Sequence, residues 1–174
     1  MFTKFHEFIA ESSSTNTVVI NGIRRSAVNS NGEFIAKSEQ GIINFYKWFG
    51  DSKFVDENGR PLVLYHGTSH KFSIFEPSRF GKLGNGMYFT SFKSDAEYYM
   101  NRYGGNELYA VYLKSDKLAE ISTPLAKKEL PSEYDAVWAY RGNKGEEIVV
   151  YQPNQIKAVN NDGSFDVDDN NIYS

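Results

Sequence analysis

The N-terminal part of the chain shows two hydrophobic patterns, one helical and one β-like. In residues 1–11 aromatic and aliphatic side chains recur every three or four positions, which predicts a short amphipathic helix. Residues 12–16 are all serine, threonine or asparagine and predict a flexible joint. Residues 18–36 contain apolar stretches broken by two Asn-Gly pairs, which is typical of short strands. A helix is expected to begin after Ser38 and to end at Gly50.

From residue 61 onwards, short apolar segments follow one another more closely. The segments PLVLY, MYF, ELYAVYLK, DAVWAY, EEIVVY and IKAV predict strands, and the turn RGNKG predicts a hairpin. The segment SDAEYYMNRYGG predicts a helix with Ser94 as its N-cap and Gly104 just past its end. Because strands outnumber helices, we expect an α+β fold with a mainly antiparallel sheet.

The length of 174 residues corresponds to a single domain. We expect residues 1–16 to form an N-terminal helix or leader with its joint, and residues 17–159 to form the domain. Residues 160–174 are polar and acidic, and they predict a flexible tail.

Composition excludes several classes of function. The chain has no cysteine, which excludes disulfides, thiolate zinc sites and cysteine nucleophiles. Its three histidines lack metal-ligand spacing, so we expect no metal site. The net charge of −3 is too small to indicate a nucleic-acid or membrane partner by itself. No apolar run approaches the ~18 residues that a membrane span needs, and we expect a monomer with no membrane partner.

Four segments carry residues with chemical potential. They are His66-Gly67-Thr68, Gly86-Met87-Tyr88-Phe89, Ala96-Glu97-Tyr98 and the run EIVVY that begins at Glu147. Taken alone, each has an ordinary structural interpretation, such as a core histidine, packing tyrosines or a soluble strand edge. Their order along the chain and their local contexts are more specific than any one of them.

In this order the segments resemble the NAD-dependent ADP-ribosyltransferases of the histidine–tyrosine–glutamate class, which includes diphtheria-type toxins and poly(ADP-ribose) polymerases. LYHGT, GNGMYFTSFKSDAEYY and EIVVYQPNQIK are similar to the three motifs of that class. Within that class, the chain most resembles the small domains of phage and polyvalent bacterial effector proteins. The resemblance covers residues 44–159 and implies an ADP-ribosyltransferase-like split, mainly antiparallel β-sheet core with a few short helices.

The resemblance implies a role for each motif residue. His66 would bind and orient a ribose or the phosphate side of NAD, and Thr68 would add a hydroxyl contact. The backbone of Gly67 would approach the carboxamide, since glycine has no side chain in the way. Tyr88 and Tyr98 would stack on the nicotinamide ring. In the implied assignment His66, Tyr88 and Glu147 are catalytic, whereas NAD binding involves His66, Gly67, Thr68, Tyr88 and Tyr98.

Two adjacent glutamates compete for the catalytic role. On a strand, Glu146 and Glu147 point to opposite faces. The EIVVY match selects Glu147, which would stabilise the positive charge that develops on the ribose when the bond to nicotinamide breaks. Val149 and Tyr151 would then share the face of Glu147. A bulge at Gly145 would undo this register.

The implied function is transfer of a single ADP-ribose from NAD to a macromolecule. Gly145 stands where arginine-modifying members carry Gln or Glu, which disfavours arginine as the acceptor. Asp95 replaces the polymerases' serine, and no elongation site is recognisable. Host protein, RNA and DNA remain possible acceptors. A catalytically inactive NAD-binding or virion interaction module of the same fold is the alternative.

The resemblance to phage proteins implies a place of action. A phage-encoded or toxin-like effector would act in the host cytoplasm, delivered from the virion. The N-terminal segment is similar to leaders of phage head proteins that are trimmed after a hydrophobic–x–Glu sequence, and Ile9-Ala10-Glu11 fits that pattern. The alternative is that this segment is an amphipathic helix packed on the domain.

Overall fold

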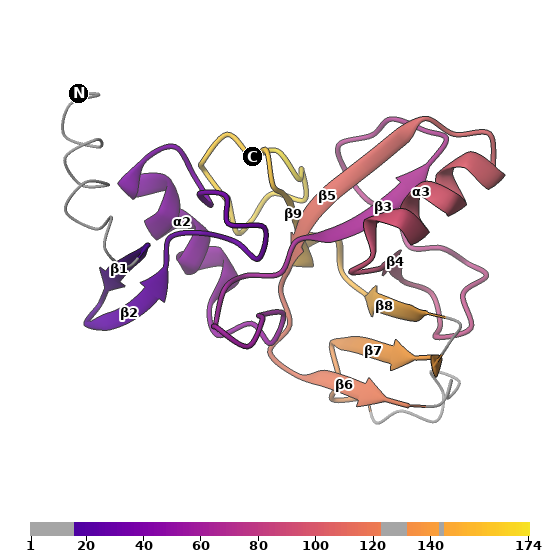
Figure 1. Ribbon diagram of the computed structural model, residues 1–174, viewed down its shortest axis with the longest axis horizontal. Coiled ribbons are helices and arrows are strands. Elements are labelled where there is room, and N and C mark those ends of the chain that lie inside the picture. Colours follow the sequence, from indigo (N-terminus) through magenta and orange to yellow (C-terminus); the bar gives the residue numbers. More distant parts are fainter. Residues whose placement is uncertain (1–15, 123–131, 143–144) are drawn as a thin grey trace.

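The computed structural model describes residues 16–122, 132–142 and 145–174. It confirms the α+β class, with a β-hairpin and a helix at one end and two further sheets with a second helix at the other (Figure 1). The predicted helix of residues 1–11 and the leader cleavage at Glu11 lie outside the described residues. Of the predicted joint, residue 16 is described.

The N-terminal hairpin follows from its turn residues. Strands β1 (Thr17–Ile20) and β2 (Ile23–Ser26) pair in antiparallel register. The turn between them is Asn21-Gly22, with φ of 51° and 78°. A two-residue turn with two positive φ angles matches the right-handed twist of the strands, and asparagine and glycine accept such angles most readily.

Helix α2 (Glu39–Phe49) has the ends that the sequence predicts. The Ser38 side chain accepts a hydrogen bond from the Gly41 N–H at 3.0 Å. Gly50, with φ of 59°, donates its N–H to the Tyr46 carbonyl at 2.9 Å. The buried side of the helix carries several rings, and Phe45 lies among them. The cap serine and the terminal glycine thus fix the helix length, and the aromatic side chains fix its orientation.

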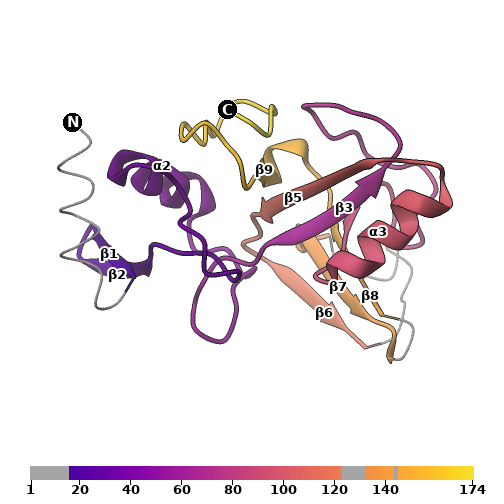
Figure 2. The same cartoon turned by 45° about the horizontal axis from the view of Figure 1, so that its top comes forward.

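The first of the two further sheets has three strands in the order β3-β5-β9, all antiparallel. Its strands are β3 (Leu64–Thr68), β5 (Glu107–Leu113) and β9 (Ile156–Ala158). The short 3-10 helix η3 (Pro153–Gln155) turns the chain into β9. Helix α3 (Lys93–Arg102) lies beside β3 in both ribbon views (Figures 1 and 2).

The second sheet has four strands in the order β4-β8-β7-β6. Its strands are β4 (Met87–Phe89), β8 (Glu146–Val150), β7 (Ala136–Tyr140) and β6 (Leu118–Ile121). The β7–β8 hairpin is confirmed, whereas β6 is an additional strand. It pairs in parallel with β7, so no local turn in the sequence announces it.

Strands β3 and β4 meet at one point and then diverge. The Tyr65 N–H donates to the Thr90 carbonyl at 2.8 Å, and the Thr90 N–H donates back to the Tyr65 carbonyl at 3.1 Å. Beyond this pair β3 continues with β5, and β4 continues with β8. The two sheets therefore separate between Gly67 and Tyr88.

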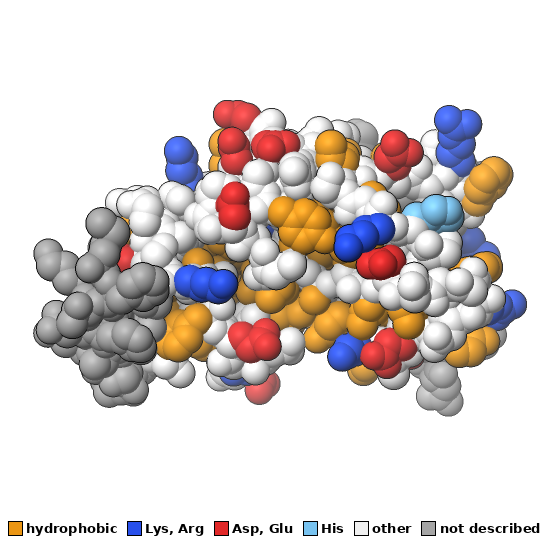
Figure 3. All heavy atoms as spheres, turned by 90° about the horizontal axis from the view of Figure 1, so that it is seen from above, with side chains coloured by type: hydrophobic (Ala, Val, Ile, Leu, Met, Phe, Trp, Pro, Cys, Tyr) orange, Lys and Arg blue, Asp and Glu red, His pale blue; other side chains and the backbone are white. Residues whose placement is uncertain are grey.

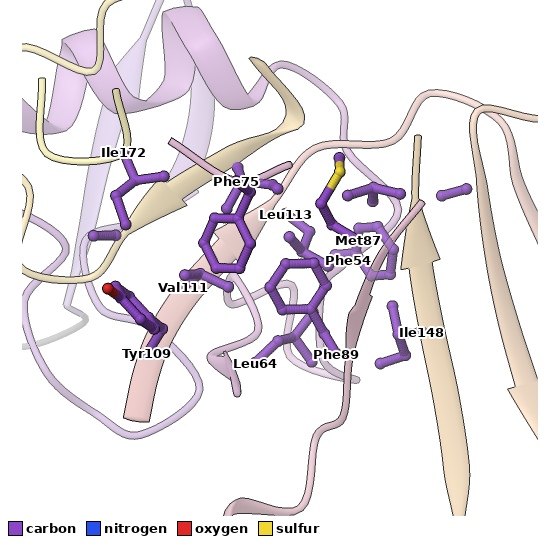
Figure 4. Packing of buried hydrophobic residues seen from close by; sticks show 14 residues of the cluster. Phe54, Leu64, Phe75, Met87, Phe89, Tyr109, Val111, Leu113, Ile148 and Ile172 are labelled. Atoms are coloured by element: carbon purple, nitrogen blue, oxygen red, sulfur yellow. The ribbon is translucent and has the colours of Figure 1, made fainter. Parts of the chain in front are cut away.

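The main core fills the space between the two sheets. Leu64, Val111 and Leu113 approach from one sheet, and Met87 and Ile148 approach from the other (Figure 4). All five are at most 2% exposed. Complete burial of such a side chain contributes about 1.5–3 kcal/mol. The core therefore fixes the angle at which the sheets diverge.

Residues 160–174 are packed against the domain, which corrects the predicted flexible tail. Phe165 and Ile172 are 1% and 0% exposed. Lys157 on β9 is fully buried, and its Nζ donates to the carbonyls of Asp169, Asn171 and Ser174 at 2.7–3.0 Å. A buried ammonium group needs such acceptors. Two apolar anchors and one lysine thus hold a segment that its acidic composition suggested was loose.

The surface carries charges of both signs. In the view from above, acidic and basic side chains are interspersed among hydrophobic ones, with no large field of one sign (Figure 3). This pattern agrees with the small net charge. Among the described residues, no helix is long and apolar enough to cross a membrane.

Candidate active site

A pocket of about 740 Å³ lies where β3 and β4 diverge. Its walls come from these two strands, from helix α3, from the loop between β3 and β4, and from the start of β8. Among the residues that line it are five of the six predicted site residues, namely His66, Gly67, Thr68, Tyr88 and Glu147. The sixth, Tyr98, does not line it.

His66 bridges the two strands at the split. Its Nδ1 lies 2.7 Å from the Tyr88 carbonyl oxygen. Because a carbonyl oxygen only accepts, Nδ1 carries the hydrogen, and in the neutral ring Nε2 is left as an acceptor. Burial lowers the pKa of His66 below its usual value, against the opposing effect of the Tyr88 carbonyl. The ring packs edge-on to Phe75 at 5.2 Å, which fixes its orientation.

Gly67 has two reasons to be glycine. A Cβ at this position would lie 2.0 Å from the Ala96 carbonyl oxygen, so the glycine permits α3 to pack closely on β3. Backbone groups alternate in direction along a strand. The N–H and C=O of Gly67 therefore point to the same side as those of Tyr65, toward the gap between the sheets.

Thr68 ends β3 at the pocket wall. Its Oγ1 accepts a hydrogen bond from the backbone N–H of His70 at 3.3 Å. The side chain thus also stabilises the turn that leaves the strand. Its hydroxyl hydrogen is not used in that bond, because the hydroxyl oxygen acts there as the acceptor.

The Tyr88 hydroxyl is fixed by the loop that precedes its strand. It donates to the Gly84 carbonyl at 2.8 Å and accepts from the Leu83 N–H at 3.1 Å. Burial raises the pKa of Tyr88, and the nearby Glu147 charge acts in the same direction. Gly81 lies so close that a Cβ there would meet the hydroxyl. The hydroxyl is therefore occupied, and the contribution of Tyr88 to the pocket is its ring.

Tyr98 lies on the outside of α3, contrary to its predicted role as a ring of the pocket. It is 59% exposed, and its hydroxyl accepts a hydrogen bond from Arg102 at 3.3 Å. Tyr99 lines the pocket instead. Helix periodicity explains the difference, because Ala96 faces the pocket and Tyr99 follows it by three residues. Tyr98 follows Ala96 by two residues and points elsewhere.

Glu147 is paired inside the pocket with Arg141. An Nη of Arg141 and a carboxylate oxygen of Glu147 form an ion pair, and both side chains are about three-quarters buried. The Nε of Arg141 is buried and has no hydrogen-bond partner among the described residues. The sequence suggested only a basic loop before Glu147. The contact depends on the register of the β7–β8 hairpin, in which Glu147 pairs with Ala139, two residues before Arg141 on the same face.

Glu146 is held on the opposite face of β8. Its carboxylate accepts hydrogen bonds from the Ser91 N–H at 2.6 Å and from the Trp138 indole N–H at 2.7 Å. The ladder between β7 and β8 runs unbroken from Glu146 onward, so no bulge shifts the register. Both glutamates line the pocket. Glu146, however, is already occupied by two structural donors.

The rest of β8 follows the predicted alternation. Val149 packs in a cluster with Leu83 and Val137, against which Tyr88 and Tyr151 lie. Ile148 and Val150 belong to the main core between the sheets. The prediction that Val149 and Tyr151 share the face of Glu147 is therefore confirmed.

The described residues contain no group of three or more His, Asp or Glu side chains arranged to hold a metal ion. The cation paired with Glu147 is the Arg141 guanidinium. The groups of the pocket that bear on chemistry include His66, the rings of Tyr88 and Tyr99, the Gly67 backbone and the Glu147 carboxylate beside the Arg141 guanidinium.

The family comparison supports an ADP-ribosyltransferase-like domain in this chain. Residues 56–131 match the model of a family described as ADP-ribosyltransferase in polyvalent proteins. The matched region spans less than half of the chain and contains His66, Gly67, Tyr88 and Tyr99, whereas Glu147 lies beyond it. A comparison with curated proteins finds no significant match.

Proposed function

We propose that this protein is a mono-ADP-ribosyltransferase that cleaves NAD at the nicotinamide–ribose bond and transfers ADP-ribose to a macromolecule. One observation carries the proposal. His66, Tyr88 and Glu147, far apart in the sequence, line a single pocket where two sheets separate. The family match supports ADP-ribosyltransferase activity in general.

The pocket can hold the flat nicotinamide ring. Tyr88 and Tyr99 line it from β4 and α3 and offer two aromatic faces. The Gly67 N–H and C=O would pair with the carboxamide, which carries one acceptor and two donors. The Nε2 atom of the neutral His66 would accept a hydrogen bond from a hydroxyl of the ribose.

Glu147 would act on the reaction itself. When the bond between ribose C1′ and the nicotinamide nitrogen breaks, its electron pair passes to the ring and neutralises it. Positive charge then develops on the ribose, and the Glu147 carboxylate would stabilise it. An acceptor oxygen or nitrogen forms the new bond to C1′ and gives up its proton.

Arg141 would assist by changing partners. Its ion pair with Glu147 offsets part of the carboxylate charge, and its Nε–H is unused. The NAD pyrophosphate carries the kind of anionic oxygens that a guanidinium binds in bidentate fashion. We infer that NAD draws Arg141 toward its phosphates and leaves Glu147 free for the ribose.

The resemblance implies a phage-encoded or toxin-like effector that acts in the host cytoplasm. The acceptor would then be a host molecule. The alternative is an inactive module of the same fold that binds NAD or a virion component. The presence of Glu147 in the pocket favours the enzyme, because such a module has no need for that carboxylate.

One experiment separates the two possibilities. Isothermal titration measures NAD binding to the protein. Chromatography measures nicotinamide release in the presence of labelled NAD and a host-cell extract. The enzyme should bind NAD, release nicotinamide and transfer label to macromolecules. NAD binding without nicotinamide release would establish the inactive NAD-binding module. No NAD binding would refute the enzyme and that module, and would leave the module that binds a virion component.

A further inference from the structure

The mouth of the pocket carries aromatic and basic side chains that the proposed chemistry does not use. Phe80 is 95% exposed and Tyr103 is 69% exposed. Lys71 and Lys82 are also exposed, and all four line the same pocket. Two aromatic plates and two cations therefore surround the entrance.

The loop that carries Phe80 is held in place beside the site. The Ser78 N–H donates to the Gly86 carbonyl at 2.9 Å, and the Gly84 N–H donates to the Gly81 carbonyl at 3.1 Å. The hydroxyl of Tyr88 is bound to the Gly84 carbonyl. These contacts leave Phe80 projecting into solvent, with Arg79 and Lys82 beside it in the sequence.

The second plate lies at the end of α3. Tyr103 follows the helix, and its N–H still donates to the Tyr99 carbonyl at 3.2 Å. The next turn packs against β3, because a Cβ at Gly105 would meet the Thr68 carbonyl oxygen at 2.3 Å. Tyr103 is therefore fixed relative to the pocket, although its ring remains exposed.

We propose that this mouth is the acceptor subsite and that the acceptor is a single-stranded nucleic acid; the proposal rests on the proposed function. Bases stack on isolated aromatic plates, and lysine and arginine side chains neutralise the phosphates between them. A protein partner would be expected to meet a continuous apolar centre with a polar rim. Here the exposed part of the lining combines the Phe80 and Tyr103 rings with Lys71 and Lys82.

The acidic residues of the pocket do not oppose this assignment. Glu147 is paired with Arg141, and Glu146 is bound by two N–H donors. Asp95 is half-buried at the wall of the pocket, near Gly145. Among the residues that line the pocket, Glu76 is the exposed carboxylate, and the two exposed lysines Lys71 and Lys82 outnumber it. The transferred group would join a hydroxyl, amine or phosphate oxygen of the strand, which loses its proton if it carries one.

Binding tests the proposal without catalysis. Fluorescence anisotropy with labelled 20-nucleotide single-stranded RNA and DNA should show binding that weakens as salt increases. Phe80→Ala should weaken binding about 10-fold, whereas Phe80→Tyr should retain it. Lys82→Ala should reduce the slope of the logarithm of the binding constant against the logarithm of the salt concentration by about one, the value for one phosphate contact. Phe34→Ala, at an exposed aromatic residue in the N-terminal part, is the matched control.

Catalysis supplies the second arm. In Phe80→Ala, transfer of label to the oligonucleotide should fall about 10-fold, while cleavage of NAD with water as acceptor stays at the wild-type rate. The proposal is overturned if the wild type binds neither strand, if Phe80→Ala behaves as Phe34→Ala, or if water-dependent NAD cleavage falls equally. A wild type that binds the strand but never cleaves NAD would establish a nucleic-acid binding site at the mouth and refute both the proposed function and the acceptor role.

Discussion

The aromatic residues around α2 and those around the pocket have similar chemistry but opposite arrangements. The Phe45 ring lies 4.8–5.9 Å from the rings of Tyr46, Trp48, Phe49, Tyr112 and Phe165. None of these residues is more than 7% exposed. At the pocket, Tyr99 and Tyr103 are 49% and 69% exposed. Buried rings that pack against one another stabilise the fold, whereas rings that remain exposed around a pocket are available to bind ligands.

The largest expected effect is on stability, in the α2 cluster. Phe45→Ala removes a ring with 0% exposure and should lower the free energy of unfolding by about 3–5 kcal/mol. Urea denaturation followed by tryptophan fluorescence would measure it. Phe34→Ala, 41% exposed, should change the free energy of unfolding by less than about 0.5 kcal/mol. Equal losses in the two variants would contradict the comparison.

Gly67→Ala should affect both stability and the site. Its Cβ would meet the Ala96 carbonyl oxygen, so α3 must shift away from β3 at a cost of about 1–3 kcal/mol. The displaced helix would carry Tyr99 with it, and NAD binding should weaken. Calorimetric melting and NAD titration check the two effects. Gly59→Ala is a poor control because of its positive φ, whereas Ser73→Ala, in an exposed loop, is suitable.

The pair Tyr98 and Tyr99 tests which ring belongs to the pocket. Tyr99→Ala should weaken NAD binding about 10-fold, and Tyr99→Phe should largely preserve it, because the ring face rather than the hydroxyl is used. Tyr98→Ala should leave NAD binding unchanged. Isothermal titration of the three variants is sufficient. A loss at Tyr98 with none at Tyr99 would restore the assignment made from the sequence.

The smallest expected effect is a pH dependence from His66. Burial lowers its pKa in the folded protein, whereas the unfolded chain keeps the usual value near 6.5. As the pH falls below about 6.5, the unfolded chain binds a proton first, so the free energy of unfolding falls. Urea denaturation at pH 7.5 and 5.5 should show a smaller loss for His66→Asn than for the wild type. An equal loss would show that His66 is not held neutral.

The sequence predicted those parts of the fold that short segments determine. Ser38 and Gly50 specify the ends of α2, and the pair Asn21-Gly22 specifies the first hairpin, because cap and turn chemistry acts over a few residues. Strand β6 was not predicted, since it pairs in parallel with β7 and a parallel pair is not joined by a tight turn. The packing of residues 160–174 depends on Lys157, whose burial no local pattern indicates.

The candidate site was predictable to a similar extent. His66, Gly67 and Tyr88 stand in strand motifs, and the structure places them in one pocket. The sequence predicted Tyr98 as the ring from the helix, whereas Tyr99 lines the pocket, because the match was made on an Ala-x-Tyr pattern. The three-residue spacing from Ala96 to Tyr99 would have found it. The contact of Arg141 with Glu147 follows from the register of the β7–β8 hairpin, because Ala139 pairs with Glu147 and Arg141 is two residues further along on the same face. That register could not be derived from either strand alone.

The most direct test of the account is Glu147→Gln, measured for NAD binding and nicotinamide release in the same preparation. The amide keeps the shape but not the charge that would face the ribose cation. Nicotinamide release should therefore fall about 100-fold or more while the Kd for NAD changes little. Glu120→Gln, on the exposed edge strand β6, is the control and should behave as wild type. Full nicotinamide release by Glu147→Gln would contradict the assignment of this pocket as the catalytic site.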